Sequence, residues 1–156
     1  QVAGRAGRGD VPGRVVMQTY NPDHFIIKAS QKQDYIDFFN HETPFRKALA
    51  YPPFSRMIQL KISGTRLSKV KAHAQTMADA LAQLPECRGD NPPVKVLGPV
   101  ESSIQKISAR FRWQILVKGA SSAQVSQAVK TMMASPETQT GSGIRLTVDV
   151  DPYYLM

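Results

Sequence analysis

Two arginines near the start of the chain are the residues best suited to chemistry on a phosphate group. Arg5 and Arg8 stand three residues apart, so they can share one face of a helical turn. A guanidinium group is a planar cation that binds phosphate oxygens through two parallel hydrogen bonds. Gly4 and Gly7 allow the backbone to approach a partner closely. A flexible, basic, glycine-rich segment is the alternative interpretation of the same residues.

The complete string Gln-x-x-Gly-Arg-x-Gly-Arg, at Gln1–Arg8, resembles motif VI of superfamily 2 helicases. This resemblance implies that Arg5 and Arg8 reach the γ-phosphate of ATP bound with Mg²⁺, with Gln1 and Gly4 beside them. Arginines in that place stabilise the charge of the phosphoryl-transfer transition state. The sequence has no Walker A loop and no acidic magnesium-binding box. We therefore expect the chain to hold half of an ATP site and to be inactive as an ATPase by itself.

Composition and charge favour a globular domain that binds a polyanion. The 156 residues suffice for one domain with an appendage, and 42% of them are hydrophobic. A formal charge of +8 favours nucleic acid over a membrane as the partner. The single cysteine, Cys87, excludes an internal disulfide and a multi-cysteine zinc site, and we expect no metal.

Targeting signals are missing from the sequence. No apolar run reaches the roughly 18 residues that a membrane span needs, and the start lacks the apolar region of a signal peptide. We therefore expect a cytoplasmic protein of bacterial origin. Because the sequence begins inside a motif and without Met, we also expect it to be part of a longer protein.

The first third of the chain predicts one strand and three short helices. The apolar run within residues 14–20 is typical of a buried strand. A short helix follows Asn21-Pro22-Asp23, and a second is predicted at residues 31–40. Thr43 and Pro44 read as the cap and first turn of a third helix that ends near Ala50.

The remainder of the chain alternates between strand and helix patterns. Two-residue alternation predicts strands at residues 56–63, 94–97, 110–118 and 144–150. A helical period predicts a helix over residues 67–84 with Ser68 as its cap, and another that follows Ser121. Residues 98–109 form either a loop or an extended hairpin tip. The order β-α-β-β-α-β predicts an α+β, ferredoxin-like domain with both helices on one face of a four-stranded sheet.

Polar residues of the predicted strands fall on the sheet face opposite the helices. Such a face could follow a DNA backbone with little sequence preference, or it could be an ordinary solvated or domain-docking face. Its candidate DNA-binding side chains, beside Gln59, are Lys61, Lys95, Arg110, Arg112, Gln114, Lys118 and Arg145.

Three further features bear on binding. Lys106 and Arg110 flank the 98–109 segment and could grip a DNA branch point. Phe111 and Trp113 alternate in phase with apolar neighbours, so we expect them in the core rather than stacked on bases. Asp149 and Asp151 are expected to form salt bridges or turns rather than a metal site.

Five strings in the right order resemble the PriA family of primosomal replication-restart helicases. The resemblance implies an ATP-dependent 3′-to-5′ DNA helicase that acts at branched or stalled forks and assembles the primosome. It also implies a C-terminal domain that is similar to a small ribosomal-subunit protein and binds branched or single-stranded DNA. The five strings are Gln18–Pro22, Tyr51–Phe54, Val96–Pro99, Arg110–Gln114 and Val148–Pro152.

The same resemblance implies a domain division and a set of partners. Residues 1–30 would end the second RecA-like helicase lobe, residues 31–54 would form a helical linker, and residues 55–156 would form the DNA-binding domain. The implied protein partners are the single-stranded DNA-binding protein and other primosome proteins, and the family's zinc region would lie upstream. A protein-docking module, with its basic face turned toward acidic protein tails, is the alternative function.

Overall fold

The structure is a computed structural model that describes residues 13–152. These residues divide into two units, one that ends at Pro44 and one that begins at Phe45. The phosphate-binding candidates Gln1, Gly4, Arg5 and Arg8 lie outside the described residues.

The first unit contains helix α1, Phe25–Lys32, and most of helix α2, Tyr35–Ala48, which continues into the second unit. Gln33 separates the two helices, because its backbone is left-handed at φ 54°. The Asp34 carboxylate then accepts a hydrogen bond from the Asp37 N–H at 2.9 Å, which caps the start of α2. The rings of Phe25 and Phe38 stack with centroids 6.3 Å apart. Local capping and contacts among aromatic rings thus organise this unit.

Two of the sequence predictions for this unit are wrong. Residues 14–20 form no strand, and the Val16 side chain is 83% exposed. A strand needs a neighbour to pair with, and the described part of this unit contains no other strand. Thr43 and Pro44 do not begin a helix, because Pro44 lies inside α2. Proline removes one backbone donor from the helix, and the bonding resumes beyond it, with Leu49 N–H donating to Phe45 O at 2.9 Å.

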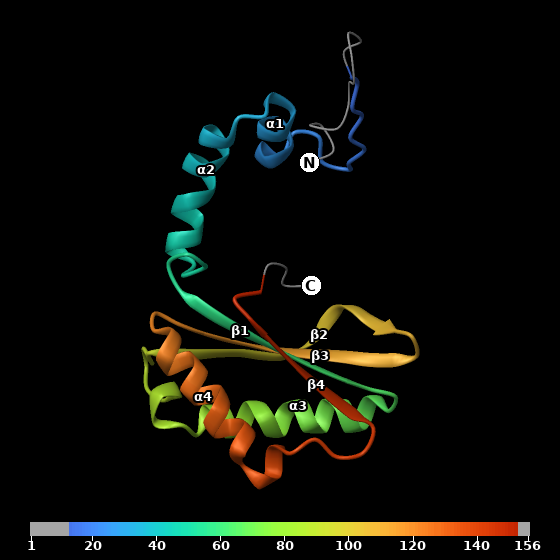
Figure 1. Cartoon of the computed structure of the whole chain (residues 1–156), viewed down its shortest axis with the longest axis vertical. Helices are drawn as coiled ribbons and strands as arrows, with labels where there is room; N and C mark the ends of the chain where they lie inside the picture. The colour runs from blue at the N-terminus through green and yellow to red at the C-terminus, as the bar shows by residue number, and fades with distance from the viewer. Residues whose placement is uncertain (1–12, 153–156) are drawn as a thin grey trace. The chain divides into compact units, whose positions relative to one another are not determined.

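The second unit is built on a four-stranded sheet with the strand order β2-β3-β1-β4. Its strands are β1 (Arg56–Gly64), β2 (Val94–Ile107), β3 (Arg110–Gly119) and β4 (Ile144–Val150). All three neighbouring pairs are antiparallel. Helices α3 (Leu67–Ala82) and α4 (Ser122–Ala134) lie on the same face of this sheet (Figure 1). The predicted α+β, ferredoxin-like arrangement is therefore confirmed.

The core lies between this sheet and its two helices. Leu60 and Ile62 of β1 are fully buried, and they stand opposite Ile115 and Trp113 of β3. The helices contribute apolar residues at helical spacing, among them Val70 and Met77 of α3 and Val129 of α4. Because every second strand residue points into this core, the intervening polar residues must face the other way.

The ends of the two covering helices differ. Ser121 caps α4, since its hydroxyl accepts a hydrogen bond from the Gln124 N–H at 3.4 Å, as predicted. The predicted cap of α3 is wrong, because Ser68 lies inside the helix and Arg66 occupies the cap position. Arg66 makes no side-chain hydrogen bond to the first turn. The amides at the start of α3 therefore lack a side-chain acceptor.

The segment after Leu97 forms an extended hairpin rather than a loop. Strand β2 continues to Ile107 and pairs with β3 to its tip, with register shifts between Leu97 and Val100 and between Glu101 and Lys106. Two short 3-10 helices, η2 (Pro85–Cys87) and η3 (Pro136–Thr138), complete the connections of the second unit.

Candidate nucleic-acid interface

The sheet face opposite α3 and α4, here called the polar face, collects the predicted side chains as expected. Register pairs show this directly, because residues opposite each other on neighbouring strands point to the same side. Lys61 stands opposite Gln114, and Lys95 stands opposite Lys118. The members of the polar face are Gln59, Lys61, Lys95, Arg110, Arg112, Gln114, Lys118 and Arg145.

The middle of the polar face is occupied by internal contacts. Lys61 Nζ pairs with the Asp149 carboxylate at 2.9 Å, and both side chains are half-buried. The Gln59 amide donates to Gln114 Oε1 at 2.7 Å, and Gln59 is buried. These three polar-face side chains hold strands β1, β3 and β4 together. They are poorly placed to contact a DNA strand, because Gln59 is buried and the Lys61 ammonium is already paired with Asp149.

One end of the polar face is engaged by residues that precede β1. Lys118 Nζ donates to Leu49 O at 2.9 Å and lies 5.4 Å from the centroid of the Tyr51 ring. Lys95 is exposed, and it lines a cavity of about 380 Å³ together with Lys118 and Phe54. The polar face is therefore not one continuous basic surface.

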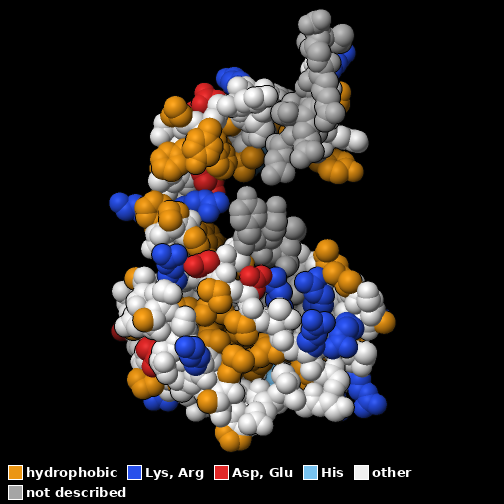
Figure 2. Space-filling model, viewed as in Figure 1, with side chains coloured by type: hydrophobic (Ala, Val, Ile, Leu, Met, Phe, Trp, Pro, Cys, Tyr) orange, Lys and Arg blue, Asp and Glu red, His pale blue; other side chains and the backbone are white. Residues whose placement is uncertain are grey.

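At the opposite end, three arginines surround Ser63 of β1, and we call this the arginine end. Arg112 of β3 and Arg145 of β4 both stand opposite Ser63 in the sheet register. Arg110 Nη2 donates to Ser63 O at 3.1 Å and to Gly143 O at 3.4 Å. Within residues 13–152, no hydrogen bond or ion pair engages the side chains of Arg112 and Arg145. Figure 2 shows Lys and Arg side chains gathered on one side of the second unit.

Lys106 does not share the polar face with Arg110. In the register, Lys106 stands opposite Phe111, and its ammonium lies 4.9 Å from the Phe111 ring centroid. Arg110 stands opposite Ile107. Lys106 and Arg110 are therefore close in sequence at the end of the 98–109 segment, but their side chains point to opposite faces of the hairpin.

Trp113 packs against the core, as the alternation predicted. It is partly buried against the core cluster, and Lys71 Nζ lies 5.8 Å from its ring centroid. A base stacked on the polar face would not reach this ring, because Trp113 points to the helix side of the sheet. Asp149 and Asp151 are also as predicted, since they pair with Lys61 and with Arg56, the latter at 3.2 Å.

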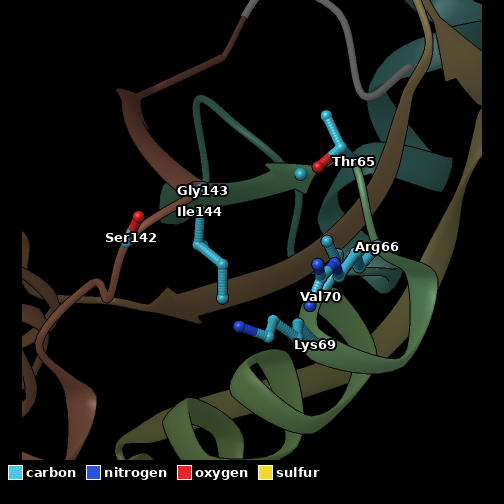
Figure 3. Close-up of a pocket in the computed structure, with 8 residues that line it drawn as sticks. Thr65, Arg66, Lys69, Val70, Ser142, Gly143 and Ile144 are labelled. Carbon is cyan, nitrogen blue, oxygen red and sulfur yellow. The ribbon is translucent and has the colours of Figure 1, made fainter.

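Two basic residues beside the arginine end were missed by sequence reasoning. Arg66 and Lys69 belong to the start of α3, and they line a pocket with Thr65, Ser142 and Gly143 (Figure 3). A signal was available in the sequence, because the start of a helix normally favours acidic residues and this one carries basic residues. Alternation along strands could not find them, since neither residue lies on a strand.

The remaining ionisable candidates do not form a catalytic or metal site. Burial, and then the charge of Glu86, raise the pKa of the Cys87 thiol, which disfavours a reactive thiolate. Burial lowers the pKa of His73. In residues 13–152, no three His, Cys, Asp or Glu side chains are arranged to hold a metal ion. No helix in the described part of the chain is long and apolar enough to cross a membrane.

Comparison with known proteins gives one consistent result. The sequence model of the family described as primosomal protein N C-terminal domain matches residues 47–153. The chain is 39% identical over 153 residues to the replication restart protein PriA of Synechocystis sp., which covers 97% of the chain and 17% of that protein. It is 32% identical over 157 residues to the protein of the same name from Bacillus subtilis, covering 100% of the chain and 19% of that protein.

A third relative, the replication restart protein PriA of Haemophilus influenzae, is 30% identical over 152 residues, covering 97% of the chain and 20% of that protein. The chain thus spans about a fifth of the length of the curated relatives that it matches.

Proposed function

The chain belongs to the family of primosomal protein N C-terminal domains, and on that premise we propose that it serves replication restart by binding branched or single-stranded DNA. The contact surface in this proposal is the arginine end of the polar face. The relatives of the chain are named replication restart proteins, which supports a role in replication restart. The geometry of the arginines at the end of the sheet supports DNA as the ligand.

The observation that carries the proposal is a pair of arginines at the end of the sheet that have no partner among residues 13–152. Arg112 and Arg145 flank Ser63 from the two neighbouring strands, and no described acidic side chain neutralises them. Internal pairing would have satisfied these guanidinium groups, as it does Lys61. Cations left without partners on one surface are suited to phosphates, which they bind by releasing the counterions of the nucleic acid.

We place this binding within a longer enzyme. In that protein, an ATP-dependent 3′-to-5′ DNA helicase, Arg5 and Arg8 would contact the γ-phosphate of ATP held with Mg²⁺, beside Gln1 and Gly4. Zinc would be held by residues upstream of this sequence. The single-stranded DNA-binding protein and other primosome proteins would be its partners, in the bacterial cytoplasm. The chain by itself would supply DNA binding without turnover.

A titration with forked, duplex and single-stranded DNA at several matched salt concentrations tests the proposal. The variant Arg112→Ala/Arg145→Ala should bind at least about tenfold more weakly, because each lost charge-assisted hydrogen bond is worth about 1.5 kcal/mol. It should also reduce the slope of log affinity against log salt by up to about 2, since each phosphate contact contributes about 0.9.

The control is Arg88→Ala/Lys130→Ala, which removes the same charge from exposed positions outside the polar face. A general effect of net charge would alter both double variants equally. Equal salt slopes in the two would reject the arginine end as the DNA-binding surface. An acidic peptide titrated in parallel distinguishes DNA binding from the alternative function of protein docking. The docking function predicts tight peptide binding and weak, non-selective DNA binding.

A further inference from the structure

A pocket of about 240 Å³ opens beside the arginine end, between the start of α3 and the turn before β4. The walls contributed by Thr65, Arg66 and Lys69 face those contributed by Ser142 and Gly143. In Figure 3, the Lys69 side chain extends from α3 toward the side of Ile144. The pocket has room for a phosphate group with a bridging water, since one water accounts for about 30 Å³ of liquid volume.

The lining of this pocket carries positive charge, and no acidic lining residue neutralises it. It includes one arginine and one lysine, and none of its lining residues is acidic. Within the described part of the chain, neither Arg66 nor Lys69 has a hydrogen-bond or ion-pair partner. Two neighbouring cations repel each other, so their joint placement on one pocket favours an anion between them.

The helix start adds to this preference. The first turn of α3 contains no acidic residue, and its cap residue, Arg66, gives it no side-chain acceptor. Free amides and the positive end of a helix dipole both attract an anion. Basic side chains at this end destabilise a helix unless an anion is present. The sequence of α3 is therefore unfavourable for the helix alone and favourable for a helix with an oxyanion at its start.

Arg110 connects this pocket to the arginine end. Its Nη2 group holds Gly143 O, on the pocket wall, and Ser63 O, one residue before Gly64 of the same wall. The Nε group of the same guanidinium is buried and finds no hydrogen-bond partner among the described residues. An unpaired buried donor is costly, so the hydrogen bonds of this guanidinium are incompletely satisfied. The pocket and the arginine end thus form one connected cationic region.

We propose that this pocket is a phosphate-binding site, with Arg66 and Lys69 as its cationic ligands and the first amides of α3 as its donors. The assignment of that phosphate to a DNA strand rests on the proposed function. The affinity of the pocket for an oxyanion does not. An internal phosphodiester and a terminal phosphate monoester share this chemistry, and strands with and without a 5′-phosphate distinguish them.

The first experiment uses inorganic phosphate as the probe and NMR amide shifts as the readout. Phosphate should shift the amides of Thr65 to Val70 and of Ser142 to Ile144 in the unmodified chain. Arg66→Gln/Lys69→Gln should abolish these shifts, and the charge-matched control Arg88→Gln/Lys130→Gln should retain them. All four positions are exposed, so the variants should fold, which thermal unfolding verifies. Unchanged amides at the start of α3 would overturn the site.

The second experiment repeats the salt titration with single-stranded DNA. Loss of one phosphate contact in Arg66→Gln/Lys69→Gln should lower the salt slope by about 0.7 relative to the control. If the salt slope of Arg66→Gln/Lys69→Gln equals that of the control, while phosphate still shifts the amides of the unmodified chain, the assignment of the site to a DNA strand is overturned. If the unmodified chain shows phosphate shifts but no DNA binding at any salt, the proposed function fails and the phosphate site stands.

Discussion

Arg110 and Arg112 belong to the same strand and the same face, yet their contacts differ. Arg110 donates to two backbone carbonyls, whereas Arg112 has no partner in the described part of the chain. The two residues should therefore separate stability from binding. Arg112→Ala should change the free energy of unfolding by less than about 0.5 kcal/mol and weaken DNA binding. Arg110→Ala should lower the free energy of unfolding by about 1 kcal/mol or more, because it breaks charge-assisted hydrogen bonds.

Chemical denaturation of both variants, followed by DNA titration, measures the two effects. The salt slope decides how binding is lost, since a folding defect lowers the active fraction without changing the slope. An Arg112→Ala variant as unstable as Arg110→Ala would contradict the assignment of Arg112 to binding.

His73 should make the stability of the second unit depend on pH. Its pKa is lowered from the ordinary value of 6.5 by burial, and its Nε2 atom is buried with no hydrogen-bond partner in residues 13–152. The unfolded chain therefore takes up this proton at a higher pH than the folded chain. The part of the folding stability that comes from keeping His73 neutral is therefore present in full above pH 6.5. It is progressively lost as the pH falls below that value.

Thermal unfolding across that pH range checks this prediction, with His73→Gln as the matched variant. The unmodified chain should lose more stability on acidification than His73→Gln does. Identical pH dependence in both would show that His73 does not titrate differently in the folded and unfolded states.

Among the elements, the β2–β3 hairpin depends on one glycine. Gly98 has φ +102°, and a Cβ added there would lie 2.9 Å from Gln114 O of the neighbouring strand. Gly98→Ala should therefore destabilise the domain by about 1 to 3 kcal/mol, through backbone strain and the clash with β3. Gly141→Ala is the control, because no atom lies within 4 Å of its added Cβ. Equal unfolding midpoints for the two variants would contradict this account.

The elements also show how far the sequence alone could lead. Alternation placed β1, β3 and β4 correctly, because their inner residues pack against helices and their outer residues do not. It stopped β2 at Leu97, since the register shifts after that residue interrupt the alternation that defines a strand. It gave a strand at residues 14–20, where the described part of the unit offers the apolar run no strand to pair with.

The candidate site was predictable only in part, and for a related reason. Strand register gathers Arg112 and Arg145 beside Ser63, and alternation is enough to anticipate their shared face. The pairing of Lys61 with Asp149 and the contacts of Lys118 depend on three-dimensional distances, which alternation does not contain. Arg66 and Lys69 come from a helix start, so they required the position of α3 relative to the turn at Gly143.

At the scale of the whole molecule, the fold determines where the basic residues behind the formal charge of +8 lie. Internal partners occupy Lys61 in the middle of the polar face and Lys118 at one of its ends. Among residues 13–152, Arg112 and Arg145 at the arginine end and Arg66 and Lys69 in the adjoining pocket have no hydrogen-bond or ion-pair partner. A basic composition favours a polyanionic ligand, and the fold brings Arg110, Arg112, Arg145, Arg66 and Lys69 to one end of the sheet.

The division of function in the proposed longer protein predicts that this chain, purified alone, releases no phosphate from ATP with or without DNA. In the proposed protein Arg5 and Arg8 would supply cations for a transition state, but the sequence has no phosphate-cradling loop and no acidic residue pair for Mg²⁺ in a recognisable motif. Two arginines without a positioned nucleotide stabilise nothing. A phosphate-release assay on the chain, with Arg8→Ala as its partner, measures this. Turnover that survives repurification and disappears in Arg8→Ala would mean that the chain holds a complete nucleotide site.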